Sequence, residues 1–323
     1  MSSPTTATRP SLAARVAARL DWRSNIIYIA FVVVFILFAI FLGNDGFLSP
    51  NNMLNIVRQT ATISIMAIAM TFVIATAEID LSVGSVAGLA SVVTAMTTTQ
   101  FGLIPGIIAG LAAGAVIGAI NGGLVALLKI PSFLVTLGML GLAAGLAQWI
   151  TSSAPQPIAD RLYVMIFGGG DFGPVPGLLV WTVLAVAVGW VVMNRTGYGR
   201  KVLATGGNPT AAAYTGIRTA RIKFTVLLIS GMAAALAGML YAGRLESGRF
   251  QWGQGDELTV IAAVILGGTS LFGGRGAIIG TLFGSLFMGL VNNGLILAGL
   301  DVAQQQVVRG AIIIAAVALS RKK

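Results

Sequence analysis

Long apolar runs occupy most of this chain and limit its possible folds more than any other feature. Of its 323 residues, 56% are hydrophobic and only 9% are charged, whereas soluble globular chains carry about 25% charged residues. A helix that crosses a bilayer needs about 20 mostly apolar residues, and its backbone satisfies its own hydrogen bonds. The sequence therefore predicts an all-α, polytopic membrane protein, because the runs lack the alternation of barrel strands.

Ten apolar segments predict about ten transmembrane helices. They lie near residues 26–43, 56–76, 83–100, 105–128, 133–153, 174–193, 224–244, 258–273, 276–298 and 306–320. Segment 258–273 is short and rich in glycine, so it either spans the membrane or re-enters it. We expect one transmembrane domain over residues 26–320, preceded by a basic tail over residues 1–25 and interrupted by a polar loop over residues 194–223.

Basic residues predict the orientation of this domain. Lys and Arg concentrate in the short cytoplasmic loops of membrane proteins. If the N-terminus is inside, fifteen of the 20 Lys and Arg residues fall on the cytoplasmic side and five outside. We therefore expect cytoplasmic N- and C-termini in a bacterial inner membrane. The net charge of +10 then reflects membrane orientation, and no nucleic-acid partner is expected.

Several chemical functions are excluded by residues that the chain does not have. It contains no Cys and no His, so disulfides, thiol chemistry, imidazole catalysis and the usual zinc sites are ruled out. No GxxxxGK[ST] phosphate-binding loop occurs in the sequence. We expect no catalytic residue, no metal site and no cofactor on this chain, and a membrane enzyme is therefore disfavoured.

The loop over residues 194–223 contains the signals of a short helix parallel to the membrane. Asn208 is a favourable N-cap, Pro209 suits the first helical position, and Gly216 suits a left-handed helix end. From these residues alone, the loop could equally be a solvated basic connector or a site for lipid head groups.

Four stretches resemble the ABC permeases for ribose, xylose and related sugars, in the same order along the chain. The stretch TGGNPTAAAYTGI resembles the cytoplasmic coupling helix of that family, through Gly206, Gly207, Asn208, Ala211, Ala212, Gly216 and Ile217. The others are EIDLSVGS at residues 78–85, IPSFLVTLGMLGLAAGLA at residues 130–147 and a glycine-rich block at residues 266–295. The resemblance covers roughly residues 50–320.

This resemblance implies the permease subunit of an ATP-driven importer for a monosaccharide or similar small polar solute. It implies a separate ABC ATPase subunit that holds ATP and Mg and receives the coupling helix. A periplasmic or lipid-anchored solute-binding protein and a second permease copy are also implied. The mixed charges of loops 154–173 and 245–257 suit docking of the binding protein.

Two carboxylates interrupt the apolar sequence at the predicted cytoplasmic end of segment 56–76. A charge within the bilayer is costly unless it faces water or a partner. Asp80 or Ser82 could cap the next helix, and Glu78 could pair with a basic residue of the inner loops. These three residues are also candidates for a gate or for contact with solute. Glu78 and Asp80 would be the ion-coupling groups of the alternative function, an ion-coupled secondary transporter.

Side-chain amides lie within two other predicted spans. Gln148 falls in segment 133–153, and Asn292 and Asn293 fall in segment 276–298. Such amides either join neighbouring helices by hydrogen bonds or line a polar path, so all three are candidates for both roles.

Overall fold

The structure is a computed structural model that describes residues 22–172 and 175–320. Helices account for most of this part of the chain, which confirms the predicted all-α class. The long helices are α2 (Trp22–Phe41), α3 (Pro50–Ala75), α4 (Val83–Phe101), α5 (Leu103–Ala126), α6 (Ser132–Thr151), α8 (Gly177–Arg195), α11 (Thr219–Arg244), α13 (Ile278–Leu297) and α14 (Val302–Ser320).

Short elements connect these helices. They are helices α7 (Arg161–Val164), η1 (Met165–Gly169), α9 (Gly197–Gly207), α10 (Pro209–Tyr214) and α12 (Asp256–Leu266), and strands β1 (Gln156–Pro157), β2 (Asp171–Phe172), β3 (Val175–Pro176) and β4 (Ser247–Gly248). Strands β2 and β3 form a hairpin, whereas β1 pairs with the distant β4.

Each of the ten predicted segments coincides with a helix, but the helices differ in length. Six are long and apolar enough to cross a membrane, namely α3, α5, α6, α8, α11 and α13. The described apolar stretches of α2 and α14 are shorter. The number of spans and the orientation of the termini therefore stay predictions, and most of the expected basic tail lies outside the described residues.

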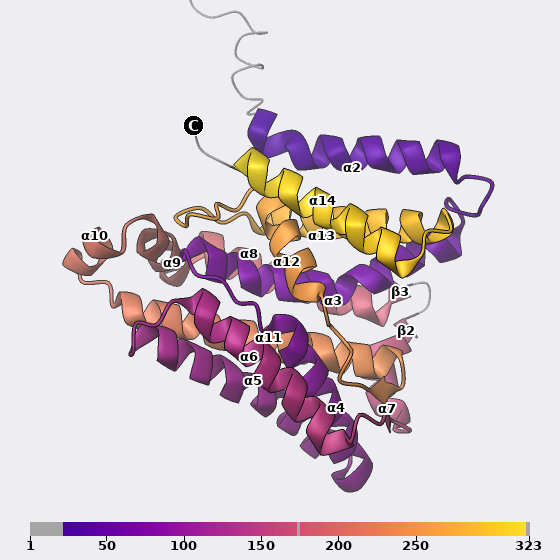
Figure 1. Ribbon diagram of the computed structural model, residues 1–323, viewed down its shortest axis with the longest axis horizontal. Coiled ribbons are helices and arrows are strands. Elements are labelled where there is room, and N and C mark those ends of the chain that lie inside the picture. The colour runs from indigo at the N-terminus through magenta and orange to yellow at the C-terminus, as the bar shows by residue number, and fades with distance from the viewer. Residues whose placement is uncertain (1–21, 173–174, 321–323) are drawn as a thin grey trace, which may run out of the picture.

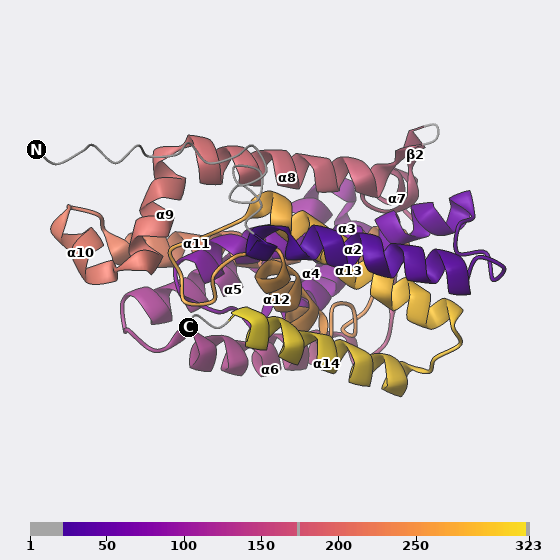
Figure 2. The same cartoon turned by 90° about the horizontal axis from the view of Figure 1, so that it is seen from above.

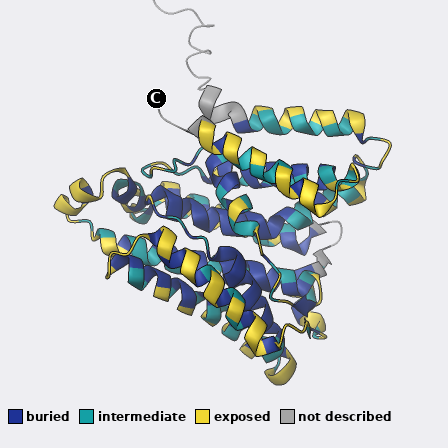
Figure 3. Cartoon of the chain, in the orientation of Figure 1, coloured by how far each residue is buried: buried dark blue, intermediate teal, exposed yellow. Residues whose placement is uncertain are grey.

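Helix α3 lies in the centre of the bundle, and α11 packs against α3, α4 and α5 (Figure 1). In the most apolar window of α3, 83% of the residues are buried, compared with 28% in each of α5, α6 and α8. The outer faces of these three helices expose large apolar side chains such as Ile108, Leu137 and Val188. Figure 3 shows this contrast between a buried centre and an exposed periphery, which is the pattern expected of a bundle surrounded by lipid.

Helix α4 begins part-way along the bundle, because the chain turns back into it after α3. Depth within the bundle can be measured along the axis of α11, because each helical residue adds about 1.5 Å. Glu78 pairs with Lys223 near the start of α11, and Asp80 bonds Ser230 seven residues later. In α4 itself, the Cα atom of Ala87 lies 3.0 Å from the position of a Cβ added at Gly238. The segment over residues 76–82 therefore re-enters the bundle, and Ser230, the partner of Asp80, lies about 10 Å farther along α11 than Lys223, the partner of Glu78.

A second segment packs inside the bundle, contrary to the expectation of an exterior loop over residues 245–257. Arg249 exchanges two hydrogen bonds with the Ser91 hydroxyl of α4, at 3.1 and 3.2 Å. Further along, Gly253 is buried against the backbone of Gly84. This stretch therefore runs antiparallel to the first half of α4, and its central part is packed against that helix and not available to a docking partner.

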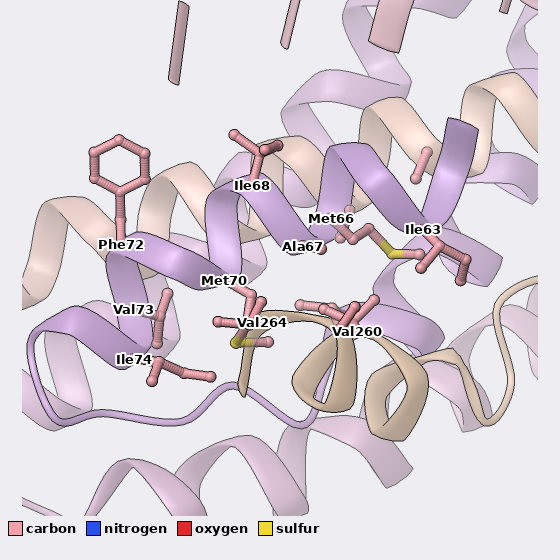
Figure 4. Close-up of a cluster of buried hydrophobic side chains, with 14 of the residues drawn as sticks. Ile63, Met66, Ala67, Ile68, Met70, Phe72, Val73, Ile74, Val260 and Val264 are labelled. Atoms are coloured by element: carbon pink, nitrogen blue, oxygen red, sulfur yellow. The ribbon is translucent and has the colours of Figure 1, made fainter. Parts of the chain in front are cut away.

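Helix α12 follows this stretch and is too short to cross a bilayer. Its 11 residues span about 16 Å, whereas the hydrocarbon core is about 30 Å thick. Val260 and Val264 pack against α3 near Ile63 and Met70 (Figure 4). The predicted segment 258–273 thus contains a helix only as far as Leu266, and the re-entrant alternative is favoured.

Candidate functional site

The predicted cytoplasmic helix is present as α10, and its local signals act as expected. The Asn208 side chain accepts a hydrogen bond from the Ala211 amide at 2.9 Å, and Pro209 occupies the first helical position. After the helix, Gly216 adopts a φ of 86°, which glycine tolerates because it has no Cβ. Helices α9 and α10 lie at one end of the long axis of the bundle in both Figure 1 and Figure 2.

The seven residues that resemble the family's coupling helix differ in exposure. Gly207, Asn208, Ala211 and Gly216 are exposed, Ile217 is half-buried, and Gly206 and Ala212 are buried within the chain. Tyr214, which the sequence analysis did not select, is 89% exposed. Its spacing of three residues after Ala211 places both on one face of α10. The outer face of the helix therefore presents an aromatic ring beside small side chains.

Gly206 holds α9 against the end of α3 and against the turn that precedes α13. We call this contact the glycine junction, formed by Gly206, Gly273, Gly274 and the Ala75 carbonyl. The Gly274 amide donates to the Ala75 carbonyl oxygen at 3.0 Å. A Cβ added at Gly206 would overlap that oxygen and would lie 2.8 Å from the Gly274 nitrogen. The backbones at this junction are therefore too close for any side chain larger than that of glycine.

Glu78 forms an ion pair with Lys223, as the pairing alternative from the sequence predicted. The Glu78 Oε1 and Lys223 Nζ atoms are 2.5 Å apart, and the two side chains are 10% and 28% exposed. Lys223 belongs to the first turns of α11, which follows α10 directly. The pair therefore links the chain that leaves α10 to the segment that re-enters the bundle.

Asp80 is buried and accepts hydrogen bonds from its own segment and from helix α11. Its Oδ1 atom accepts from the backbone amide and the hydroxyl of Ser82, at 3.0 and 2.6 Å. Its Oδ2 atom accepts from the Ser230 hydroxyl of α11 at 2.7 Å. Asn121 of α5 donates to the Ser82 hydroxyl at 3.0 Å. These bonds join the re-entrant segment to α5 and α11.

The expectation that Ser82 caps α4 through its side chain is wrong. Ser82 stands at the N-cap position, but its side chain accepts no hydrogen bond from the helix, because the hydroxyl is engaged with Asp80 and Asn121. Sequence reasoning missed Asn121 and Ser230. Asn121 could have been found as an amide within an apolar segment, whereas Ser230 gave no signal beyond its place in a span.

The three candidate amides lie in different surroundings. Asn293 and Asn52 exchange two hydrogen bonds, at 2.8 and 3.0 Å, so Asn293 joins α13 to α3. Asn292 is half-buried and lines a polar cavity between helices. Gln148 is exposed on α6, and its side chain makes no hydrogen bond with another described residue. The structure thus brings α10, the glycine junction, Glu78 and Asp80 into one continuous region, and places Gln148, Asn292 and Asn293 outside it.

Comparison with known proteins identifies the family. Residues 52–317 match the family described as branched-chain amino acid transport system / permease component. The chain is 43% identical over 282 residues to the ribose import permease protein RbsC of Bacillus subtilis, covering 87% of this chain and 88% of the relative. It is 40% identical over 306 residues to the fructose import permease protein FrcC of Rhizobium meliloti, covering 91% and 84%.

A third relative extends the alignment over nearly the whole chain. The L-arabinose ABC transporter permease protein AraH of Azospirillum brasilense is 34% identical over 316 residues, covering 98% of this chain and 92% of the relative. No solved structure matches the chain. Because the family match covers most of the chain and the relatives align over nearly their full length, the chain belongs to the branched-chain amino acid transport system permease family, as a sugar ABC permease of the ribose and arabinose type.

Proposed function

We propose that this chain is the membrane-spanning subunit of an ATP-driven importer that moves a monosaccharide or similar small polar solute across the bacterial inner membrane. The observation that carries the proposal is the connection between α10 and the re-entrant segment. An exposed helix stands at one end of the bundle, and the glycine junction and the Glu78–Lys223 pair connect it to the buried carboxylate of Asp80.

ATP hydrolysis would take place on a separate chain in this arrangement. The sequence contains no phosphate-binding loop of the GxxxxGK[ST] type, so ATP and Mg would bind a partner ATPase that receives the outer face of α10. Movement of α10 would reach the re-entrant segment through backbone contacts at the junction. Packed backbones transmit such a movement because protein interiors are nearly incompressible.

The other partners would contact different faces of the bundle. The segment that contains β1 is anchored by pairing with the buried strand β4, and its exposed face would receive a periplasmic or lipid-anchored binding protein. A second permease copy would complete the transporter within the bilayer.

Ion-coupled transport is the second function considered, and the structure offers it little support. It requires a carboxylate that takes up and releases a cation during transport. Glu78 already pairs with Lys223, and both carboxylate oxygens of Asp80 accept hydrogen bonds from hydroxyl groups. Both acidic residues therefore have structural partners in the described part of the chain.

Co-purification tests the proposal. The tagged chain is extracted from its native host in mild detergent, and stoichiometric partners are identified by mass spectrometry. We expect an ABC ATPase with the wild-type chain, and its loss with Ala211→Asp or Tyr214→Asp, because both side chains are exposed on α10. The control is Ala154→Asp, an equally exposed alanine distant from α10, which should retain the ATPase.

The opposite result would favour ion-coupled transport. If no ATPase co-purifies with the wild-type chain, and an uncoupler abolishes solute uptake while ATP is maintained, the proposal is wrong. Glu78 and Asp80 would then be the groups to test for ion coupling.

A further inference from the structure

A polar cavity of about 180 Å³ lies between α3, α11, α12, α13 and α14. It belongs neither to α10 nor to the Asp80 network. Its polar lining comes from five different helices and includes Gln59, Tyr241, Arg244, Asp256, Asn292 and Arg309. Such a convergence of polar groups within a largely apolar bundle is typical of a ligand site.

The cavity lies in the half of the bundle that is remote from α10. Tyr241 is 22 residues from the start of the 26-residue helix α11, about 33 Å along its axis. On α3, by contrast, Gln59 is nine residues from the end that begins at Pro50, about 14 Å inward. The cavity thus lies near the helix ends opposite the expected ATPase surface, where Arg244 ends α11 and Asp256 begins α12, and it reaches about 14 Å inward along α3.

Two side-chain amides in the cavity have unused hydrogen-bond donors and acceptors. Gln59 and Asn292 are half-buried, and neither side chain bonds another residue in the described part of the chain. Each amide offers two donors and an acceptor. Half-buried amides without protein partners are suited to bind a polar ligand.

The remaining polar groups are held in place by the fold. The Tyr241 hydroxyl donates to the Asp256 Oδ2 atom at 2.7 Å, which orients the carboxylate and leaves its Oδ1 atom available. Arg309 donates through Nε to the Gln305 carbonyl at 3.4 Å, so its two terminal nitrogens remain available. On the apolar side, Gly289 allows α13 to approach Thr60 closely, since an added Cβ would lie 2.5 Å from the Thr60 methyl group.

This set of groups specifies a class of ligand. Amides, guanidinium groups and a carboxylate supply donors and acceptors side by side, which matches vicinal hydroxyl groups that both donate and accept. Arg244 and Arg309, together with nearby Arg58, are offset in part by Asp256 and Glu257. The volume is below the roughly 300–1,000 Å³ of pockets for drug-sized molecules, so it suits a single sugar ring.

We propose that this cavity binds a neutral, polyhydroxylated solute the size of a monosaccharide on its way through the permease. Gln59 and Asn292 would bind its hydroxyl groups, and Asp256 and Arg309 would orient it. This site rests on the proposed transport function, and it assigns the solute a place within one chain.

Cysteine protection tests the site directly. The chain contains no cysteine, so Gln59→Cys and Asn292→Cys each introduce a single reactive thiol. Right-side-out vesicles of the native host are treated with a small, charged methanethiosulfonate reagent, with and without millimolar D-ribose, D-fructose or L-arabinose. We expect at least one sugar to slow labelling of both variants by roughly threefold, the protection reached at about twice the Kd.

The matched control is Asn55→Cys, one helical turn before Gln59 on α3 and exposed. Its labelling should not respond to any sugar. If either cavity variant fails to accumulate, Thr259→Cys, from the same lining, replaces it.

Uptake of the same radiolabelled sugars by wild-type vesicles is measured in parallel. Intact ATP-dependent uptake without protection of the cavity thiols would overturn the site but not the proposed function. Protection by D-gluconate and by none of the neutral sugars would overturn the assignment to a neutral solute. Absence of ATP-dependent uptake of all three sugars would overturn the transport function and, with it, the site.

Discussion

Replacement of Gly206 by alanine should disrupt the glycine junction, whereas the same change at Gly207 should not. A Cβ at Gly206 would overlap the Ala75 carbonyl oxygen and lie 2.8 Å from the Gly274 nitrogen, but at Gly207 the nearest atom is 3.7 Å away. Because backbone atoms form the contact at Gly206, no side chain can rotate to make room, and α9 would have to move. Overpacking of this kind costs about 1–3 kcal/mol.

The Gly207→Ala change is a demanding control because it should raise the free energy of unfolding, whereas Gly206→Ala should lower it. Alanine in a helix is favoured over glycine by up to about 1 kcal/mol, and Gly207 ends α9 in open surroundings. Because both glycines lie in α9, alanine gains this propensity at either position, and the two variants should differ by the overpacking cost alone, about 1–3 kcal/mol. For a chain of this length we expect about 2 °C of Tm per kcal/mol, or a difference of about 2–6 °C.

Thermal unfolding of the purified permease in detergent measures this difference, and transport measures its consequence. In the assembled transporter, Gly206→Ala should reduce solute uptake per ATP hydrolysed, because displaced α9 no longer holds α10 against the bundle. Equal Tm values for the two alanine variants, with equal uptake per ATP, would refute the role given to the junction.

Three further predictions follow from the buried polar contacts. Glu78→Gln should destabilise the permease by about 1–3 kcal/mol, between the values for exposed and buried ion pairs. The charge-reversed double variant Glu78→Lys with Lys223→Glu should restore part of the lost Tm. An absence of this recovery would argue against the pairing. Alanine at Asn52 and Asn293 should show a coupling energy of about 1 kcal/mol in a double-mutant cycle of thermal unfolding, and additive effects would contradict the amide pair. Asp80→Asn should lower the stability by about 1–3 kcal/mol, because an amide nitrogen would replace one hydrogen-bond acceptor, and an unchanged Tm would show that the network is not required.

Local features were predicted well because their physical causes lie within a few residues. The cap at Asn208, the proline after it and the turn at Gly216 appear in the sequence as a contiguous pattern, and the structure contains each of them. The positions of the helices were predicted from the apolar segments for the same reason, because each helix depends on the composition of one stretch of chain and not on distant partners.

Features that depend on distant contacts were predicted poorly. The sequence around Ser82 is typical of an N-cap, but tertiary bonds to Asp80 and Asn121 engage its hydroxyl instead. The mixed charges of residues 245–257 were read as suited to docking of a partner, although the backbone of Arg249 in this stretch bonds Ser91 of α4. Of the site residues, Glu78 was predicted to pair with a basic residue, but the identity of that residue follows only from the approach of α11 to the re-entrant segment.

The re-entrant segment also affects the order in which the protein can be assembled. Asp80 and its partner Ser230 are separated by 150 residues, and ribosomes add about 5–20 residues per second. About 8–30 s must therefore pass between synthesis of the carboxylate and synthesis of the hydroxyl that binds its second oxygen. During that interval the 76–82 segment lacks the α11 contacts that hold it within the bundle, so its final placement must follow insertion of α11. The first half of this permease thus depends on the second half to complete its fold.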